Sequence, residues 1–238
     1  MPRTLSLPRN DVRQYEAMTD EWWRPYGAFA MLRWIAAARA ELLPPAPRPG
    51  AVLVDLGCGA GLLAPHAARL GYRHLGVDLV AGSLRLAAEH GVHPVRGDVQ
   101  RLPLADAVAD AVSAGEIFEH VPDLAATVAE ACRVLRPGGT LVLDTLAATR
   151  RARLLAVTIG ERIPGGAPPG IHDPALFVDR AELVAVAARH GVRLTLRGMR
   201  PPLLGMLRWL ARRDPDPTMV PTRSTAVLFQ GHGTKADR

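Results

Sequence analysis

The chain has 238 residues, of which 48% are hydrophobic and 22% charged, and its formal net charge is +6. This length and composition predict one globular domain with a sizeable core, and they exclude a disordered or fibrous chain. No apolar run approaches the roughly 20 residues of a membrane-spanning helix, and the first residues lack the apolar region of a secretory signal. The basic residues are scattered rather than gathered into a stripe, so we expect no nucleic-acid partner. Cys58 and Cys132 lie far apart, which indicates no disulfide framework and a cytoplasmic location.

The first 50 residues predict two helices and a proline-rich linker. Asn10 and Asp11 can cap a helix that runs through Met18, and a second helix is expected over residues 28–43. Residues 44–50 (Pro-Pro-Ala-Pro-Arg-Pro-Gly) cannot continue that helix, because proline lacks a backbone N–H and clashes with the preceding turn. They indicate a stiff linker into the core.

Residues 51–145 alternate between short apolar runs and helical segments. Apolar runs of this length suit strands that are buried on both faces of a sheet. The expected strands are residues 51–56, 73–78, 92–96, 109–114 and 140–144, and the expected helices are residues 62–70, 82–90 and 124–135. Residues 136–139 (Arg-Pro-Gly-Gly) should end the last helix and turn into the fifth strand. The repeated units predict a parallel sheet with helices on both faces and right-handed connections.

The remainder of the chain changes character. Residues 146–180 are expected to form an insertion. It begins as a helix, which ends before the prolines and glycines of residues 164–170. Residues 181–238 should add a helix that starts at about residue 180 and two strands, at 192–197 and 224–230. The chain is thus predicted to be a single doubly wound α/β domain, with a mostly parallel seven-stranded sheet and an N-terminal helical cap.

A glycine-rich loop follows the first expected strand, with the sequence Val-Asp-Leu-Gly-Cys-Gly-Ala-Gly at residues 54–61. Ligands of open parallel sheets bind beyond the carboxyl ends of the strands. Glycines at that position let the backbone turn tightly and approach a ligand closely. Asp78 ends the next strand, where a carboxylate can accept both hydroxyls of a ribose. The loop and Asp78 together predict a site for a nucleoside-containing cofactor.

The spacing of the glycines favours one class of cofactor. The dinucleotide fingerprint G-x-G-x-x-G would require glycine at position 62, where this chain has leucine. Asp55 would also repel a pyrophosphate, whereas it suits a ligand with positive charge. S-adenosylmethionine carries a sulfonium and an ammonium group and no phosphate. The charge argument therefore favours a methyl donor over a nicotinamide cofactor.

These residues resemble the class I S-adenosylmethionine-dependent methyltransferases. The resemblance rests on the loop at residues 55–61, on Asp78, and on Asp98 after the third strand. It implies that the loop glycines lie against the methionine and ribose, that Asp78 holds the ribose hydroxyls, and that Asp98 bonds the adenine amine.

A closer resemblance covers almost the whole chain and is to the O-methyltransferases of ubiquinone biosynthesis, which methylate catechol-like hydroxyls of polyprenylated rings. It rests on residues 15–27 (Y-E-A-M-x-x-x-W-W-x-P-x-G), 116–122 (E-I-F-E-H-V-P) and 170–177 (G-I-H-D-x-x-x-F). The resemblance implies that Arg39 bonds the carboxylate of the donor. The candidate cofactor-binding residues are Arg39, Asp55, Gly57, Cys58, Gly59, Gly61, Asp78, Leu79, Asp98, Val99 and Glu116.

Glu116, Glu119 and His120 are the candidate catalytic residues. Their i, i+3, i+4 spacing would place them on one face of a helical turn. A free phenol has a pKa near 10 and must lose its proton to become a good nucleophile, and His120 could act as the general base. Alternatively the three side chains could hold a divalent cation that acidifies the hydroxyl, and the family resemblance supports a metal there, either magnesium or zinc. In a third interpretation the carboxylates bond backbone amides and His120 packs in the core.

The insertion departs from that family. Its insertion is an amphipathic helix proposed to touch the membrane, whereas the Pro-Gly-Gly at 164–166 should break such a helix here. We therefore expect at most weak peripheral membrane contact, and a soluble phenol as acceptor is as plausible as a prenylated one. Trp22, Trp23 and Phe118 are candidate lining residues.

The sequence thus predicts methyl transfer from S-adenosylmethionine to a hydroxyl oxygen of a phenolic, catechol or quinol-like molecule. The donor motifs do not report the acceptor atom, so carbon and nitrogen acceptors in secondary metabolism stay open. A nicotinamide-dependent oxidoreductase and a donor-binding domain without turnover are the interpretations outside this class.

Overall fold

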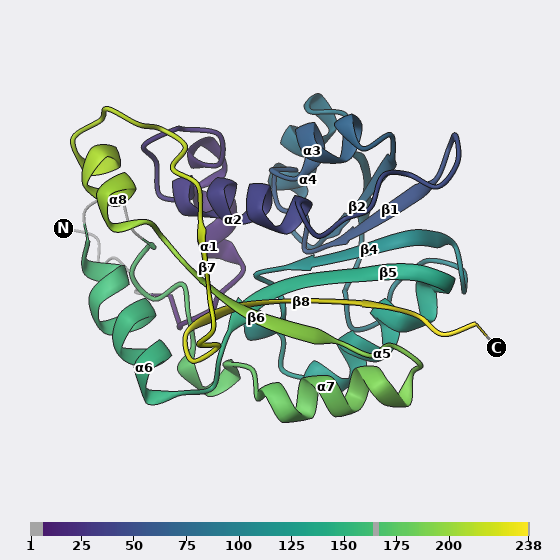
Figure 1. Cartoon of the computed structure of the whole chain (residues 1–238). Helices are drawn as coiled ribbons and strands as arrows, with labels where there is room; N and C mark the ends of the chain where they lie inside the picture. Colours follow the sequence, from purple (N-terminus) through teal and green to yellow (C-terminus); the bar gives the residue numbers. More distant parts are fainter. Residues whose placement is uncertain (1–6, 164–166, 238) are drawn as a thin grey trace.

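An eight-stranded sheet runs through the centre of the molecule, with the strand order β3-β2-β1-β4-β5-β8-β6-β7 (Figure 1). The computed structural model describes residues 7–163 and 167–237. The strands are β1 (Val52–Leu56), β2 (Arg73–Asp78), β3 (His93–Arg96), β4 (Ala109–Gly115), β5 (Leu135–Leu146), β6 (Thr195–Arg200), β7 (Val220–Thr222) and β8 (Leu228–Thr234). β1 to β5 are parallel, whereas β8, β6 and β7 add antiparallel pairs at one side.

The sheet is buried between two layers of helices. α3 (Ala64–Arg69) and α4 (Ala81–Glu89) cover one face, and α5 (Leu124–Val134) and α7 (Arg180–Arg189) cover the other (Figure 1). The largest core cluster joins Val54 and Leu141 of the sheet to Val128 of α5 and Leu183 of α7. Central strands that are covered on both faces need unbroken apolar runs, which is why their positions could be predicted from the sequence. The doubly wound α/β prediction is confirmed.

The number of strands differs from the prediction, because the sheet has eight rather than seven. The additional strand, β7, has three residues and pairs only with β6. Its central residue is Pro221, which an edge strand tolerates because its backbone nitrogen need not donate to a neighbour. So short a strand shows no alternation in the sequence. The residues between β6 and β7, for which the sequence predicted no element, contain α8 (Leu203–Leu210).

Residues 136–139 do not form the expected turn before the fifth strand. β5 already begins at Leu135, and its pairing with β4 shifts register between Ala109 and Ala111. Gly138 has a φ of 73°, and its N–H donates to the carbonyl of Lys235. The two glycines therefore form an irregularity inside a long strand and not a turn that precedes it. The backbone of Lys235 bonds to both glycines, a contact that sequence reasoning did not include.

The remaining elements gather at one side of the sheet, on the left in Figure 1. From the N-terminal part come α1 (Arg13–Ala17), η1 (Thr19–Glu21) and α2 (Ala30–Ala40), which is shorter than expected. Between β4 and α5 lies η2 (Phe118–His120). From the expected insertion come α6 (Arg150–Ala152), the π-helical turn η3 (Arg153–Ile159), η4 (Gly160–Arg162) and η5 (Pro174–Leu176). The Pro-Gly-Gly predicted to break a helix, at 164–166, lies outside the described residues.

We expect Gly61→Ala to destabilise the protein more than Gly50→Ala. Both glycines have positive φ, 78° and 73°, which costs a residue with a Cβ about 1–2 kcal/mol. A Cβ at Gly61 would also lie 2.9 Å from Val92 Cγ2, whereas one at Gly50 would meet nothing within 4 Å. The overlap should add about 1–3 kcal/mol to the loss at Gly61. Urea unfolding of both variants checks this, and equal losses would show that Val92 does not pack this closely against Gly61.

Candidate functional site

A cavity of about 870 Å³ lies at the carboxyl ends of the parallel strands. Its lining comes from the loops after β1, β2 and β4, from the N-terminal helices, and from η3 and α8. Ligand cavities usually have about 300–1,000 Å³, so this one has room for a cofactor together with a small acceptor.

The glycine-rich loop lines one end of this cavity. Gly57 and Gly59 have φ values of 63° and 51°, which lie in the left-handed region. A Cβ at Gly57 would lie 2.6 Å from Ile117, and one at Gly59 would overlap the indole ring of Trp22. The loop is also tied to the N-terminal segment, because Trp23 Nε1 donates to the carbonyl of Ala60 over 3.0 Å. Glycine is thus required where the N-terminal segment covers the loop.

Asp78 lies beside the loop at the end of β2, as predicted. Its carboxylate accepts hydrogen bonds from the backbone N–H of Gly59 at 2.9 Å and of Val80 at 2.8 Å. Burial raises the pKa of Asp78, and these amides partly offset that effect. A carboxylate oxygen can accept more than one hydrogen bond, so Asp78 can still bind a hydroxyl in the cavity.

The end of the cavity beside the glycine-rich loop, which we call the donor end, contains more acidic than basic groups. Arg39 is buried, and its Nη1 lies 2.7 Å from both carboxylate oxygens of Asp144. A Cβ at Gly115 would overlap the guanidinium, so this position accommodates only glycine. Asp55 Oδ2 lies 3.2 Å from His74 Nε2. Burial raises the pKa of Asp55, but His74 and Arg39 outweigh that effect and lower it overall, so Asp55 stays ionised.

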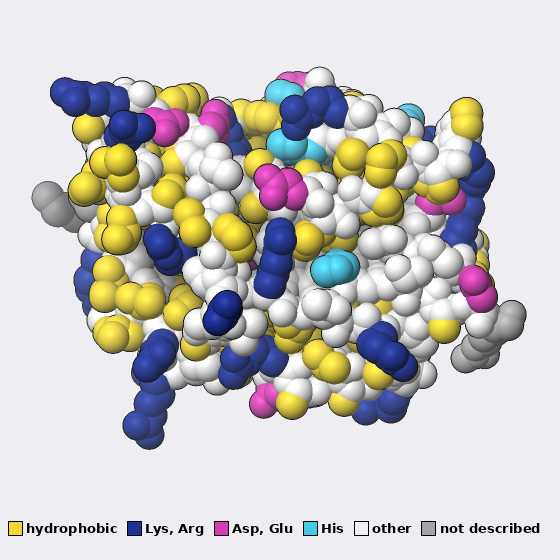
Figure 2. Space-filling view, in the orientation of Figure 1, with side chains coloured by type: hydrophobic (Ala, Val, Ile, Leu, Met, Phe, Trp, Pro, Cys, Tyr) yellow, Lys and Arg dark blue, Asp and Glu magenta, His cyan; other side chains and the backbone are white. Residues whose placement is uncertain are grey.

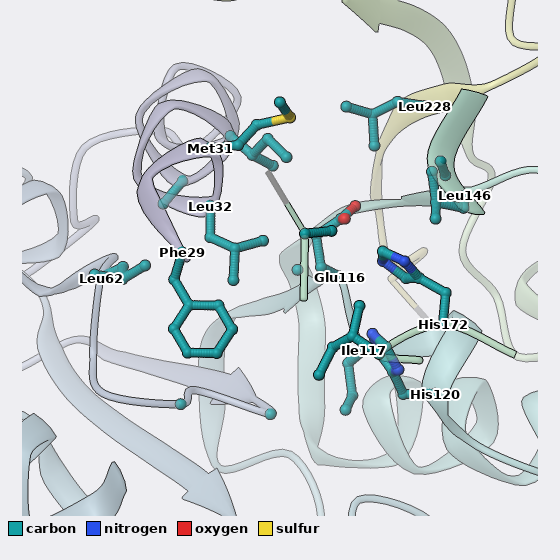
Figure 3. A pocket seen from close by; sticks show the side chains of 18 of the residues that line it. Phe29, Met31, Leu32, Leu62, Glu116, Ile117, His120, Leu146, His172 and Leu228 are labelled. Atoms are coloured by element: carbon teal, nitrogen blue, oxygen red, sulfur yellow. The ribbon is translucent and has the colours of Figure 1, made fainter. Parts of the chain in front are cut away.

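Glu116 lines the cavity directly after β4 (Figure 3). Its φ of 49° is unusual for a residue with a side chain, and such strain often occurs at functional sites. Its Oε1 is buried and has no hydrogen-bond partner among the described residues. Burial raises the pKa of Glu116 well above its ordinary value, and the Glu119 carboxyl raises it further. Burial therefore favours the neutral form of this carboxyl, and the Arg39 guanidinium acts in the opposite direction.

Glu119 and His120 do not share a face with Glu116. η2 is a single 3-10 turn, and Glu116 precedes it in the left-handed conformation, so the expected helical spacing does not apply. Glu119 is fully buried, and its Oε2 accepts a hydrogen bond from the Thr145 hydroxyl at 2.7 Å. His120 lines the cavity, where its Nδ1 and Nε2 contact Asn10 and Tyr15. Burial and the neighbouring His172 lower the pKa of His120 to about 3.

This arrangement does not fit the predicted metal site. Within residues 7–163 and 167–237, no three His, Cys, Asp or Glu side chains are grouped closely enough to hold a metal ion. Glu119 bonds Thr145 inside the core, and both ring nitrogens of His120 already have protein partners. The three side chains do not form one cluster, because a left-handed residue and a 3-10 turn replace the continuous helical turn that the sequence spacing assumed.

The other predicted residues divide between cavity and core. Cys58, Leu79, Asp98 and Val99 line the cavity, and Asp98 Oδ1 accepts a hydrogen bond from the N–H of Gln100 at 2.9 Å. Gly61 packs against α4, beside Ala87, rather than lining the cavity. Of the three aromatic candidates, Trp22 lines the cavity, Trp23 stacks on His90, and Phe118 is fully buried in the core.

Among the polar residues that line the cavity and that sequence reasoning missed are Asn10, Tyr15 and His172. Tyr15 and His172 belong to motifs that carried the family resemblance, but no role was assigned to them. Asn10 was interpreted as a helix cap. Their position beside His120 depends on tertiary contacts, so only the composition of the motifs could have indicated them.

Comparison with known proteins agrees with this geometry. The model of a methyltransferase domain family matches residues 54–143. The ubiquinone biosynthesis O-methyltransferase of Methylobacterium sp. is 32% identical over 234 residues, which cover 90% of this chain and 93% of the relative. Its counterpart from Ralstonia nicotianae is 33% identical over 199 residues, 79% of this chain and 83% of the relative. The crystal structure of an S-adenosylmethionine-dependent methyltransferase from Thermotoga maritima has the same fold, with a TM-score of 0.65 at 18% identity, covering 94% of this chain and 99% of that one.

The fold and the glycine loop define an S-adenosylmethionine-dependent methyltransferase of class I. Within that class, the chain belongs to the family of ubiquinone biosynthesis O-methyltransferases. The oxidoreductase interpretation is thereby set aside. None of the helices in the described part of the chain is long and apolar enough to cross a membrane.

We expect Glu119→Gln to stabilise the protein increasingly as pH rises. Burial raises the pKa of Glu119 to about 7, so between its ordinary value of 4.5 and that value the folded protein holds a proton that the unfolded chain releases. The free energy of unfolding therefore falls as pH rises through this range. Glutamine can keep the hydrogen bond from Thr145 but does not titrate. The free energy of unfolding of the variant relative to wild type should therefore grow by about 3 kcal/mol between pH 4.5 and about 7, at about 1.4 kcal/mol per pH unit.

Urea unfolding at pH 4.5, 6 and 8 measures this difference. The matched control is Glu89→Gln, which changes an exposed carboxyl on α4 and should have no such trend. A constant difference between Glu119→Gln and the wild type would contradict the prediction.

Proposed function

We propose that this enzyme transfers the methyl group of S-adenosylmethionine to a hydroxyl oxygen of a phenolic, catechol or quinol-like small molecule. The observation that carries the proposal is a single cavity that joins the glycine loop to an apolar compartment containing imidazoles. The names of its relatives, which are O-methyltransferases, support an oxygen acceptor.

The donor would occupy the end of the cavity formed by β1, β2 and β4. We assign the ribose hydroxyls to Asp78, and the adenine to the region of Leu79, Asp98 and Val99. Arg39 would bond the carboxylate of S-adenosylmethionine. In support of this role, its Nε is buried and has no hydrogen-bond partner among the described residues, so its N–H is available to that carboxylate. Asp55 and Glu116 would face the positive charge of the donor, which favours the ionised form of both carboxyls.

The acceptor would occupy the apolar compartment beyond Glu116. Phe29, Leu32, Ile117, Leu146 and Leu228 surround this space in Figure 3. Such walls can pack the two faces of an aromatic ring, and they exclude water from the reacting atoms.

The apolar lining continues to the molecular surface. Leu155, Ile159 and Leu203 line the cavity and are exposed at 48%, 43% and 78%. Hydrophobic side chains are gathered over this part of the molecule, on the left in Figure 2, where α6 and α8 lie in Figure 1. An acceptor with apolar substituents therefore fits better than a highly charged one. The same surface supports at most weak peripheral contact with a membrane.

The transfer is an in-line displacement at the sulfonium methyl group. Most of its acceleration would come from holding the acceptor oxygen, the methyl carbon and the sulfur in line. The hydroxyl must also lose its proton, and imidazole side chains at the acceptor end, His120 and His172, provide the basic groups. Glu116 would contribute negative charge beside the sulfonium group rather than bind a metal.

We expect Asp78→Ala to weaken the binding of S-adenosylhomocysteine by about 30-fold or more, since it removes a carboxylate that would accept two ribose hydroxyls. The control Asp106→Ala removes an exposed carboxylate outside the cavity and should leave the affinity unchanged. Isothermal titration calorimetry measures both, and Asp78→Asn separates loss of charge from loss of the loop contacts. Equal affinity of wild type and both Asp78 variants would refute the assignment.

The acceptor class is tested by incubating the wild type with S-adenosylmethionine and a panel of phenols, catechols and quinols. The proposal predicts an O-methylated product, identified by mass spectrometry and NMR. Normal donor binding with transfer only to carbon or nitrogen nucleophiles would contradict it.

A further inference from the structure

His120 is already engaged through both of its ring nitrogens. Nδ1 lies 2.6 Å from Oδ1 of Asn10, and the amide nitrogen of Asn10 donates to the backbone carbonyl of His120 over 2.9 Å. This second bond fixes the amide oxygen toward the ring, so Nδ1 must carry the proton and donate it. Nε2 then accepts from the hydroxyl of Tyr15 at 3.3 Å. Burial and the nearby Glu119 carboxyl raise the pKa of Tyr15, which keeps that hydroxyl protonated.

His172 is the second imidazole of the acceptor end. It lies within the expected insertion (146–180), lines the cavity, and stacks on His120 with ring centroids 5.7 Å apart and planes inclined by 22°. Its ring points into the cavity in Figure 3. Nδ1 is buried and lies 3.5 Å from Oε1 of Glu161, whereas no protein partner is recorded for Nε2 among the described residues.

Glu161 is built to remain a fixed carboxylate. Both of its oxygens accept from the guanidinium of Arg9, each over 3.0 Å, and Oε2 also accepts from the N–H of Gly170 at 2.9 Å. Its side chain is 5% exposed. Burial raises the pKa of Glu161, but the bonds from His172, Arg9 and Gly170 outweigh that effect and lower it to about 2. The carboxylate is therefore ionised at pH 7.

An ionised carboxylate beside one nitrogen of an imidazole has two effects. It holds the proton on the near nitrogen, which leaves a lone pair on the far one, and it stabilises the positive ring that forms when the far nitrogen takes up a proton. Hydrogen bonds of such pairs are often long before substrate binds, and they shorten in the reacting complex. Asn10 and Tyr15 give His120 no comparable carboxylate.

We propose that His172 is the general base of the methyl transfer and that Glu161 is its positioning residue, an assignment that rests on the function proposed above. The proton of the acceptor hydroxyl passes to Nε2 of His172, while an electron pair of the oxygen forms the bond to the methyl carbon. The carbon–sulfur bond breaks, and its electrons stay on sulfur to give neutral S-adenosylhomocysteine. The imidazolium releases the proton to water as the product leaves. His120, braced by Asn10 and Tyr15, forms the wall against which the ring of His172 stacks.

The test compares rates with two acceptors of different acidity, catechol and 4-nitrocatechol. His172→Asn should lower kcat with catechol by about 100- to 1,000-fold, the usual contribution of a general base. The loss should be much smaller with 4-nitrocatechol, which ionises more readily and depends less on a base. Glu161→Gln should follow the same order with a loss of about 10- to 100-fold. The matched control His232→Asn, on the exposed side of β8, should stay within about twofold of wild type.

A merely structural role for either residue would lower the rates with both acceptors equally. Binding of S-adenosylhomocysteine, measured by calorimetry on every variant, should be unchanged, which shows that the donor end is intact. Added imidazole should partly restore His172→Ala. In the ¹⁵N-labelled wild type, NMR should find the proton of neutral His172 on Nδ1, which needs no turnover.

Different failures have different meanings. An active wild type whose His172→Asn variant keeps more than about a third of its rate with catechol would overturn this assignment and leave the proposed function standing. The proton of His172 on Nε2 would also overturn it. A wild type that binds S-adenosylhomocysteine but methylates no hydroxyl would refute the proposed function, and this assignment with it.

Discussion

The buried ion pair between Arg39 and Asp144 joins the N-terminal helices to the centre of the sheet. Arg39 comes from α2 and Asp144 from β5, and their side chains are 8% and 0% exposed. Removing one partner of such a pair leaves an uncompensated buried charge, which costs about 3–5 kcal/mol. The guanidinium fits there because Gly115 has no side chain. The pair therefore fixes α2 above the strand ends, and the cavity exists because α2 is held there.

The same pair sets the electrostatic character of the donor end. Asp55, Glu116 and Asp144 lie around one guanidinium, and Glu119 lies just behind them. Burial makes this excess of acidic groups unfavourable, which is why the pKa values of Glu116, Glu119 and Asp144 are raised. A cationic ligand would relieve that cost, whereas a phosphate would increase it. This excess of acidic groups is therefore consistent with the sulfonium donor of the proposed reaction.

The acceptor end is held together by contacts between segments that are distant in sequence. Arg9 reaches Glu161 across 152 positions, and Asn10 and Tyr15 reach His120 across 110 and 105. Closing such long loops costs chain entropy, which the half-buried Arg9–Glu161 ion pair and the stacked aromatic rings offset. The N-terminal segment therefore holds the imidazoles of His120 and His172 beside the apolar compartment.

The sequence by itself determined the features that are local. The alternation of apolar runs and helices gave the parallel core, because each central strand must be apolar on both faces. The glycine loop and Asp78 located one end of the cavity, because a tight turn at a strand end restricts which residues fit. Only the tertiary structure decided where side chains from distant segments meet. Glu116, Glu119 and His120 were predicted to form one cluster because a helical turn was assumed, yet a left-handed residue and a 3-10 turn place the three side chains in different surroundings. Glu161 is held by Arg9, 152 positions away, as well as by Gly170 within the insertion, and no local pattern encodes a contact as distant as the one with Arg9.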